Sequence, residues 1–148
     1  MKGSDKGVSN KDFRFEDRIT TVSFLSLGLF VGVRGFYWTV RQDAVLGESA
    51  FYSALHEVMP IWFWGILLLT FGAFLVLASF FYGRMSVNKL SLYFVLFGGT
   101  GSAIIHFLMA SAALYNAINW LTPAQFVIVT GLLGFAGFMA GVELYARR

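Results

Sequence analysis

A single histidine within a long apolar stretch is the residue of this sequence best suited to chemistry. His106 lies in the run GTGSAIIHFLMASAA, which contains no other ionisable side chain. Histidine titrates near neutral pH and can bind a metal, and an ionisable group at the depth of a membrane core is a candidate functional residue. The alternative is a neutral imidazole that hydrogen-bonds to a hydroxyl, an amide or a backbone carbonyl. A metal site is not expected, because no second histidine or carboxylate stands three or four residues away.

Arg34 is the second ionisable group in an unusual place, one helical turn inside the end of an apolar stretch. Its methylene stem would allow the guanidinium to reach the headgroup region while the backbone stays in the apolar core. A second possibility is an ion pair with Glu48 or Glu57 in the connection that follows, which would hold that connection against the helices. A position lining a pore is the third.

The remaining polar residues do not form a catalytic set. His56 and Glu57 are adjacent, so on a helix they would not face each other, and together with Glu48 they are predicted only as polar residues of an outer loop. The chain has no cysteine, which excludes disulfides, thiolate nucleophiles and cysteine-bound metals. No phosphate-binding or hydrolase motif is present either. We therefore expect a protein that is not an enzyme and has neither a cofactor nor a metal site.

Four long apolar stretches must position these side chains, at about 19–38, 59–82, 90–113 and 124–145. Of the 148 residues, 57% are hydrophobic and 13% charged, whereas a soluble domain carries about 25% charged residues. About 20 helical residues cross a hydrocarbon core of roughly 30 Å. The sequence therefore predicts an all-α polytopic membrane protein, a four-transmembrane-helix bundle that forms a single domain over residues 12–148. Residues 1–11 are predicted to be a disordered cytoplasmic tail.

The connection Arg41–Val58 is the longest between two spans and is expected on the outer side of the membrane. Ser49 can cap a short helix there. Apolar residues then recur at helical spacing: Phe51, Leu55, Val58 and Trp62. A short helix with one apolar edge is predicted to lie in the membrane interface.

The last span carries a signal at each of its ends. Thr122 followed by Pro123 predicts a helix that begins with a threonine N-cap and proline at the first helical position. Glu143, one turn before the other end, is expected at the inner interface, where it would pair with Arg84, Lys89 or Arg147.

Basic residues are distributed unevenly between the two sides of the predicted bundle. Nine of them fall on one side: Lys2, Lys6, Lys11, Arg14, Arg18, Arg84, Lys89, Arg147 and Arg148. The other side has Arg41, with Arg34 just inside the first span. The positive-inside rule then places both termini in the cytoplasm of a multi-pass protein of the cell (inner or plasma) membrane. Because these residues flank membrane segments, the formal net charge of +3 does not indicate a nucleic-acid partner.

Small residues line one side of each predicted span. They allow helices to approach closely in lipid, where apolar burial does not drive helix association. The positions that indicate such faces are Gly28, Gly32, Gly99, Ser102, Ala103, Ala110, Gly134, Gly137 and Gly141, and in the second span Gly65, Gly72 and Ser79. One interpretation is packing of the four helices within one chain. The other is that one or two faces are surplus and mediate homo-oligomerisation.

The layout resembles that of small four-span membrane proteins encoded by bacteriophages of Gram-positive hosts. The resemblance rests on the stretches Leu55–Ile66, Gly98–Phe107 and Asn116–Phe126 and extends over nearly all of the chain. It implies one of three activities: permeabilisation of the membrane in the manner of holins, superinfection exclusion, or modulation of a host membrane protein. None of the three stretches has an assigned role in the family, so no functional residue follows from the resemblance.

The sequence favours a self-associating membrane protein that forms or gates a permeability path, holin-like or channel-like, because little of the chain lies outside the lipid. The alternative is a non-enzymatic adaptor that binds another membrane protein through the same small-residue faces. A third hypothesis is a channel that responds to pH or ions through His106.

Overall fold

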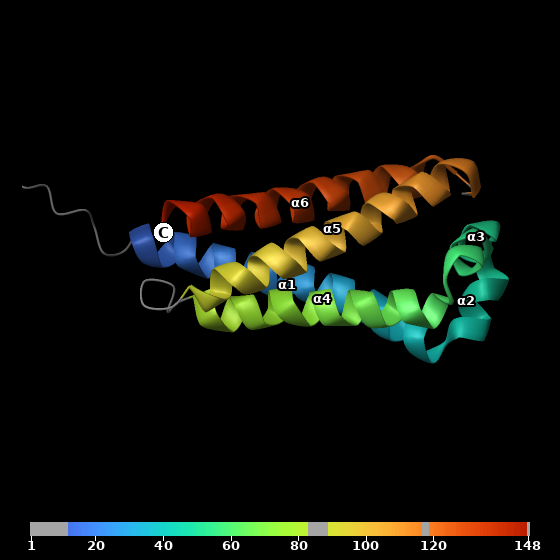
Figure 1. Ribbon diagram of the computed structural model, residues 1–148, viewed down its shortest axis with the longest axis horizontal. Coiled ribbons are helices and arrows are strands. Elements are labelled where there is room, and N and C mark those ends of the chain that lie inside the picture. The colour runs from blue at the N-terminus through green and yellow to red at the C-terminus, as the bar shows by residue number, and fades with distance from the viewer. Residues whose placement is uncertain (1–11, 83–88, 117–118, 148) are drawn as a thin grey trace, which may run out of the picture.

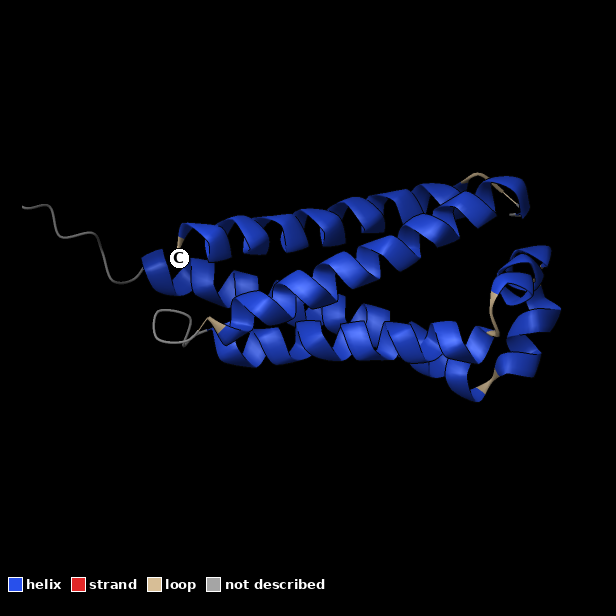
Figure 2. Cartoon of the chain, in the orientation of Figure 1, coloured by secondary structure: helices blue, strands red, loops and turns tan. Residues whose placement is uncertain are grey.

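The computed structural model of the protein describes residues 12–82, 89–116 and 119–147 (Figure 1). These residues form six α-helices joined by short loops, with no strand among them (Figure 2). The helices are α1 (Asp12–Val40), α2 (Gln42–Glu48), α3 (Ala50–Val58), α4 (Ile61–Tyr82), α5 (Leu90–Asn116) and α6 (Leu121–Ala146). The predicted all-α fold is confirmed, whereas the predicted disordered tail, 1–11, lies outside the described residues.

Four of these helices are long and apolar enough to cross a membrane. The spans are Asp17–Val40, Ile61–Tyr82, Leu90–Asn116 and Leu121–Ala146, which confirms a four-span bundle. In Figure 1, the start of α1 and the end of α6 lie at the same end of the bundle, as four crossings require. The short helices α2 and α3 lie at the opposite end.

The connection between the first two spans contains two short helices where the sequence predicted one. Ser49 adopts an extended conformation (φ −166°, ψ 158°) that separates α2 from α3, and its side chain makes no capping hydrogen bond. Phe51 and Leu55 on the apolar edge of α3 are each 4% exposed. The Trp64 indole N–H, on α4, donates to the carbonyl oxygens of Leu55 (3.2 Å) and Met59 (3.1 Å). The end of α3 is thereby attached to the start of the second span.

Close contact between glycines brings α1 against α4. A Cβ atom added at Gly35 would lie 2.6 Å from the carbonyl oxygen of Gly65, and one at Gly28 would lie 2.8 Å from that of Gly72. Such backbone approach is the packing that small residues permit between membrane helices. The α5–α6 pair packs in the same way, since a Cβ at Gly99 would lie 2.8 Å from the Leu133 carbonyl oxygen.

The helix α5 connects the two halves of the bundle. It packs against both α4 and α6, and Figure 1 shows it crossing from α4, at the end with the chain termini, toward α6 at the other end. Where α5 and α6 diverge from α4, apolar side chains from all the helices form one buried cluster. Its larger members are Trp38, Phe51, Leu55, Trp64, Met109 and Phe126.

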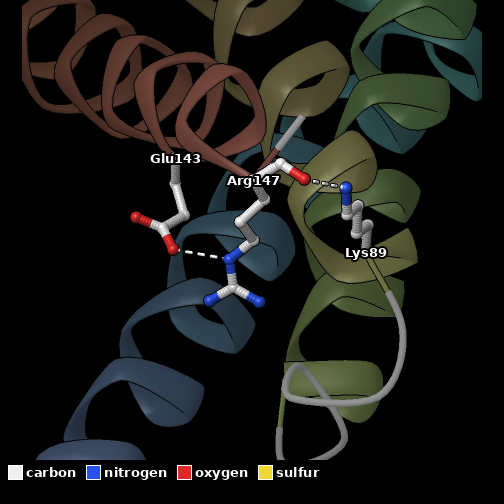
Figure 3. A network of polar contacts seen from close by, with 3 residues as sticks. All are labelled: Lys89, Glu143 and Arg147. Carbon is white, nitrogen blue, oxygen red and sulfur yellow. Dashed lines mark hydrogen bonds and ion pairs between the residues drawn. The ribbon is translucent and has the colours of Figure 1, made fainter.

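The two predictions for the ends of the last span have different outcomes. The predicted threonine N-cap is wrong: α6 begins at Leu121, whose N–H donates to the Asn119 side-chain oxygen (3.1 Å). The amide oxygen of Asn119, two residues before the helix, therefore satisfies one of the free N–H groups at its start. At the other end the Glu143 carboxylate pairs with Arg147, as predicted, and Lys89 donates to the Arg147 carbonyl oxygen (Figure 3). Half-exposed pairs of this kind, at the surface, contribute little stability.

Candidate functional site

His106 is completely buried on α5. Its Nδ1 lies 2.8 Å from the Ser102 carbonyl oxygen. A carbonyl can only accept, so Nδ1 carries the proton and donates it, and in the neutral ring Nε2 is then an acceptor. Within the part of the chain that the structure describes, neither Nε2 nor the Ser102 hydroxyl has a hydrogen-bond partner. Two unsatisfied polar groups thus lie four residues apart in the buried face of one helix, a costly arrangement.

Arg34 does not form the ion pair that was one of its predicted roles. Among the described residues no carboxylate pairs with its guanidinium, and the Glu48 carboxylate instead accepts a hydrogen bond from the Tyr37 hydroxyl (2.8 Å). The Arg34 side chain lies with its Cζ 5.0 Å from the centre of the Phe126 ring and 5.3 Å from that of Phe30. Its Nη1 is buried without a hydrogen-bond partner. The guanidinium therefore faces aromatic rings of α1 and α6, in cation–π geometry.

Phe126 is the residue that brings Arg34 and His106 together. Its ring centre lies 6.3 Å from that of His106, edge to face, and the same ring faces the guanidinium of Arg34. Phe51 of α3 stacks on it at 5.6 Å. One phenyl ring from α6 is thus in contact with side chains from α1, α3 and α5. We call Arg34, Ser102, His106 and Phe126 the intramembrane polar site.

Sequence reasoning found three of these four residues and missed Phe126. Arg34 and His106 were predicted as functional candidates, and Ser102 only as part of a packing face. Phe126 is one of 17 phenylalanines, and no spacing or motif distinguishes it from the others.

A groove runs along the surface of α1 beside the Arg34 end of this site. It has a volume of ≈ 690 Å³ and is lined by Leu29, Phe30, Val33, Arg34, Trp38 and Tyr52, among others. Burial and the Glu48 carboxylate raise the pKa of Tyr52, whereas Arg34 lowers it. A tyrosine hydroxyl is protonated at neutral pH even without this shift, so Arg34 is the one charged side chain among the described residues that line the groove.

The structure divides the predicted small residues into positions with and without room for a side chain. Gly28, Gly99 and Gly137 are in tight contact with a neighbouring helix, and Ser102, Ala103 and Ala110 are buried. By contrast, a Cβ at Gly32 would meet nothing within 4 Å, and those at Gly134 and Gly141 would each meet a single side-chain atom, at 3.6 and 3.5 Å. Most of the glycine pattern is therefore explained by packing within one chain, and a smaller part remains on the surface.

The polar residues predicted for the outer loop do not join the intramembrane polar site. His56 Nδ1 accepts the N–H of Ile61 (3.4 Å) at the start of α4, Glu48 bonds to Tyr37, and Glu57 is exposed. No group of three or more metal-binding side chains occurs among the residues that the structure describes. Comparison of the chain with family models, curated proteins and solved structures finds no match.

Replacing His106 with leucine is expected to leave the protein as stable as the wild type or to stabilise it by about 1 kcal/mol. Leucine has a similar volume, and the change removes a buried acceptor whose lack of a partner costs about 1–3 kcal/mol, against a lost hydrogen bond of about 0.5–1.5 kcal/mol. The measurement is the free energy of unfolding in mixed micelles, with Met109→Ala, a cavity-forming change one turn away, as the destabilised control. A His106→Leu protein that loses as much stability as Met109→Ala would show that Nε2 is bonded in the membrane.

Proposed function

We propose that this multi-pass membrane protein is a non-enzymatic, self-associating protein of the cell (inner or plasma) membrane, and that its assembly forms or gates a permeability path. The single observation that carries the proposal is a groove on the α5–α6 face that side chains of the chain itself leave open. It has a volume of ≈ 590 Å³ and is lined in part by Gly134, Gly137, Gly141, Thr100 and Phe138.

This groove has the properties of a helix-packing surface in lipid. Gly134 and Gly141 have room above their Cα atoms, and a Cβ at Gly131, one turn before Gly134, would meet nothing within 4 Å. Small residues of this kind let a further helix approach closely, and a hydroxyl such as that of Thr100, which is exposed, can hydrogen-bond across the contact. When the protein self-associates, the helix that packs into this groove comes from a second copy of the chain.

A permeability path is expected to form between several copies of the chain and not through a single bundle, because the interior of one bundle is apolar. Leu68, Leu75 and Leu133 are all 0% exposed. The buried polar residues of the described chain are only Ser79, Ser91, Ser102 and His106, too few to line a path across the membrane. A permeability path therefore requires association of several chains.

The charges of the described residues support an orientation with both termini in the cytoplasm. Arg18, Lys89 and Arg147 belong to the end of the bundle that carries the termini, whereas Arg41 lies at the end with α2 and α3. Basic residues near the ends of spans favour the cytoplasmic side.

Self-association is tested with single cysteines, because the chain has none of its own. Gly131→Cys is expected to form disulfide-linked dimers when membranes are oxidised, since residue 131 lies beside the α5–α6 groove. The control is Gly32→Cys on the α1–α4 side, where an added side chain also meets nothing within 4 Å. We expect non-reducing gels to show dimers of the first variant and monomers of the second. If only the Gly32→Cys variant formed dimers, the interface would instead be assigned to α1.

The permeability path is tested separately, by inducible expression in cells loaded with a membrane-potential dye. We expect depolarisation with the wild-type protein and none with Gly134→Phe, whose ring would fill the groove. Cells that stay polarised while Gly131→Cys still cross-links would contradict the path and leave self-association intact. A monomer that co-purifies with another membrane protein would contradict both and favour an adaptor that uses the same groove.

A further inference from the structure

Arg34 is a cation within a membrane-spanning helix for which the described chain supplies no anion. It lies six residues before the end of α1, about 9 Å along the helix axis. Nη1 is buried and makes no hydrogen bond, and the guanidinium otherwise faces the rings of Phe30 and Phe126. A charged side chain at membrane depth is costly unless it pairs with an opposite charge or with carbonyl oxygens. The contacts within the chain therefore leave Arg34 able to bind an anion.

The groove beside Arg34 combines this cation with an apolar strip. Leu29 and Val33, which line it, are 52% and 66% exposed on the surface of the span. Toward the α2–α3 end, Tyr37, Trp38 and Tyr52 also line the groove, and the Glu48 carboxylate is held by the Tyr37 hydroxyl. A ligand that fits both parts has a hydrocarbon chain for the strip and an anionic group for the guanidinium.

The position of the groove favours a lipid over a soluble anion. Its apolar strip lies on the surface of a helix that crosses the bilayer, so acyl chains reach it directly. A guanidinium pairs with phosphate oxygens through two parallel hydrogen bonds. Tyr52, whose hydroxyl stays protonated, provides a further donor within the same lining.

We propose that the α1 groove binds an anionic phospholipid, with the phosphodiester at Arg34 and an acyl chain along Leu29 and Val33. The lipid belongs to the leaflet at the α2–α3 end of the bundle. The Trp38 ring, 2% exposed, and the Tyr52 ring form the outer wall beside the headgroup. This site lies on α1, apart from the α5–α6 groove, and does not depend on self-association.

The test is native mass spectrometry of detergent-purified, delipidated protein titrated with phosphatidylglycerol or phosphatidylcholine. The wild type is expected to bind phosphatidylglycerol in preference, and Arg34→Gln to lose about tenfold or more of that affinity, because a hydrogen bond to a charged group contributes about 1.5–3 kcal/mol and 1.4 kcal/mol is a tenfold change. Arg41→Gln is the matched control, since Arg41 is exposed at the end of the same helix and does not line the groove. Its affinity is expected to equal that of the wild type.

A second variant tests the groove without removing the charge. Val33→Trp places a large ring on an exposed position of the strip and is expected to weaken phosphatidylglycerol binding while Arg34 is intact. Equal losses in Arg34→Gln and Arg41→Gln, or no loss in Arg34→Gln, would overturn the proposal. So would displacement of the lipid by inorganic phosphate, or equal binding of oleate, because these outcomes assign the site to a soluble anion or to a fatty acid. The same spectra report the oligomeric state, so a monomer that binds the lipid would contradict self-association alone.

Discussion

The Phe126→Ala protein is expected to be less stable than the wild type by about 3–5 kcal/mol, the usual cost of truncating a buried phenylalanine. Phe126 is 7% exposed and contacts Phe51, His106 and Arg34, which come from three different helices. Removal of its ring leaves a cavity between them and ends the cation–π contact of Arg34. The measurement is the free energy of unfolding from titration of mixed micelles with a denaturing detergent.

The matched control for this change is Phe138→Ala on the same helix. Phe138 is 65% exposed on the α5–α6 face, so its truncation leaves no cavity inside one chain and is expected to change stability by less than about 1 kcal/mol. Equal losses for the two variants would indicate that Phe126 does not fill a space enclosed by α1, α3 and α5. Such a result would remove the physical link between Arg34 and His106.

A second large loss of stability is expected from Gly35→Ala, about 1–3 kcal/mol. The added methyl would lie 2.6 Å from both the Gly65 carbonyl oxygen and the Leu69 nitrogen. These are backbone atoms, so no side-chain rotation relieves the clash and α1 must move away from α4. The same movement weakens the Gly28–Gly72 contact two turns along. The measurement is again the free energy of unfolding in mixed micelles.

Gly32→Ala, three residues earlier on the same helix, is the control for Gly35→Ala. Its methyl would meet nothing within 4 Å, and alanine favours the helix over glycine by about 1 kcal/mol. We expect this variant to be as stable as the wild type or more stable. A clear loss of stability at Gly32 would mean that another chain or a tightly bound lipid covers this position.

The intramembrane polar site could be predicted from sequence only as separate candidates. Arg34 and His106 are conspicuous because ionisable side chains are rare in apolar stretches. Their common contact with one ring could not be predicted, since 72 residues and three other helices separate them along the chain. The inward position of the Arg34 guanidinium is likewise a consequence of packing, because Phe126 from α6 supplies the face over which it lies.

The amino-acid sequence by itself determined that this is a membrane protein and that it has four membrane-spanning helices. Apolar length and charge distribution are local properties, so the four spans follow from composition along the chain, and the structure confirms them within a few residues. The division of the connection between the first two spans into α2 and α3 depends on the backbone conformation at Ser49. The bond from the Leu121 N–H to the Asn119 side chain likewise depends on local geometry.

Only the tertiary structure decided which small residues have room for a side chain and which do not. Gly28 and Gly32 form a GxxxG pair whose members look equivalent in sequence, yet a Cβ at Gly28 would collide with Gly72, and one at Gly32 would meet nothing. The rotation of each helix about its axis makes this difference, and that rotation is set jointly by contacts with every neighbouring helix. The same contacts bring a cation, an imidazole and a phenyl ring from three helices into one site, which no segment of the chain specifies alone.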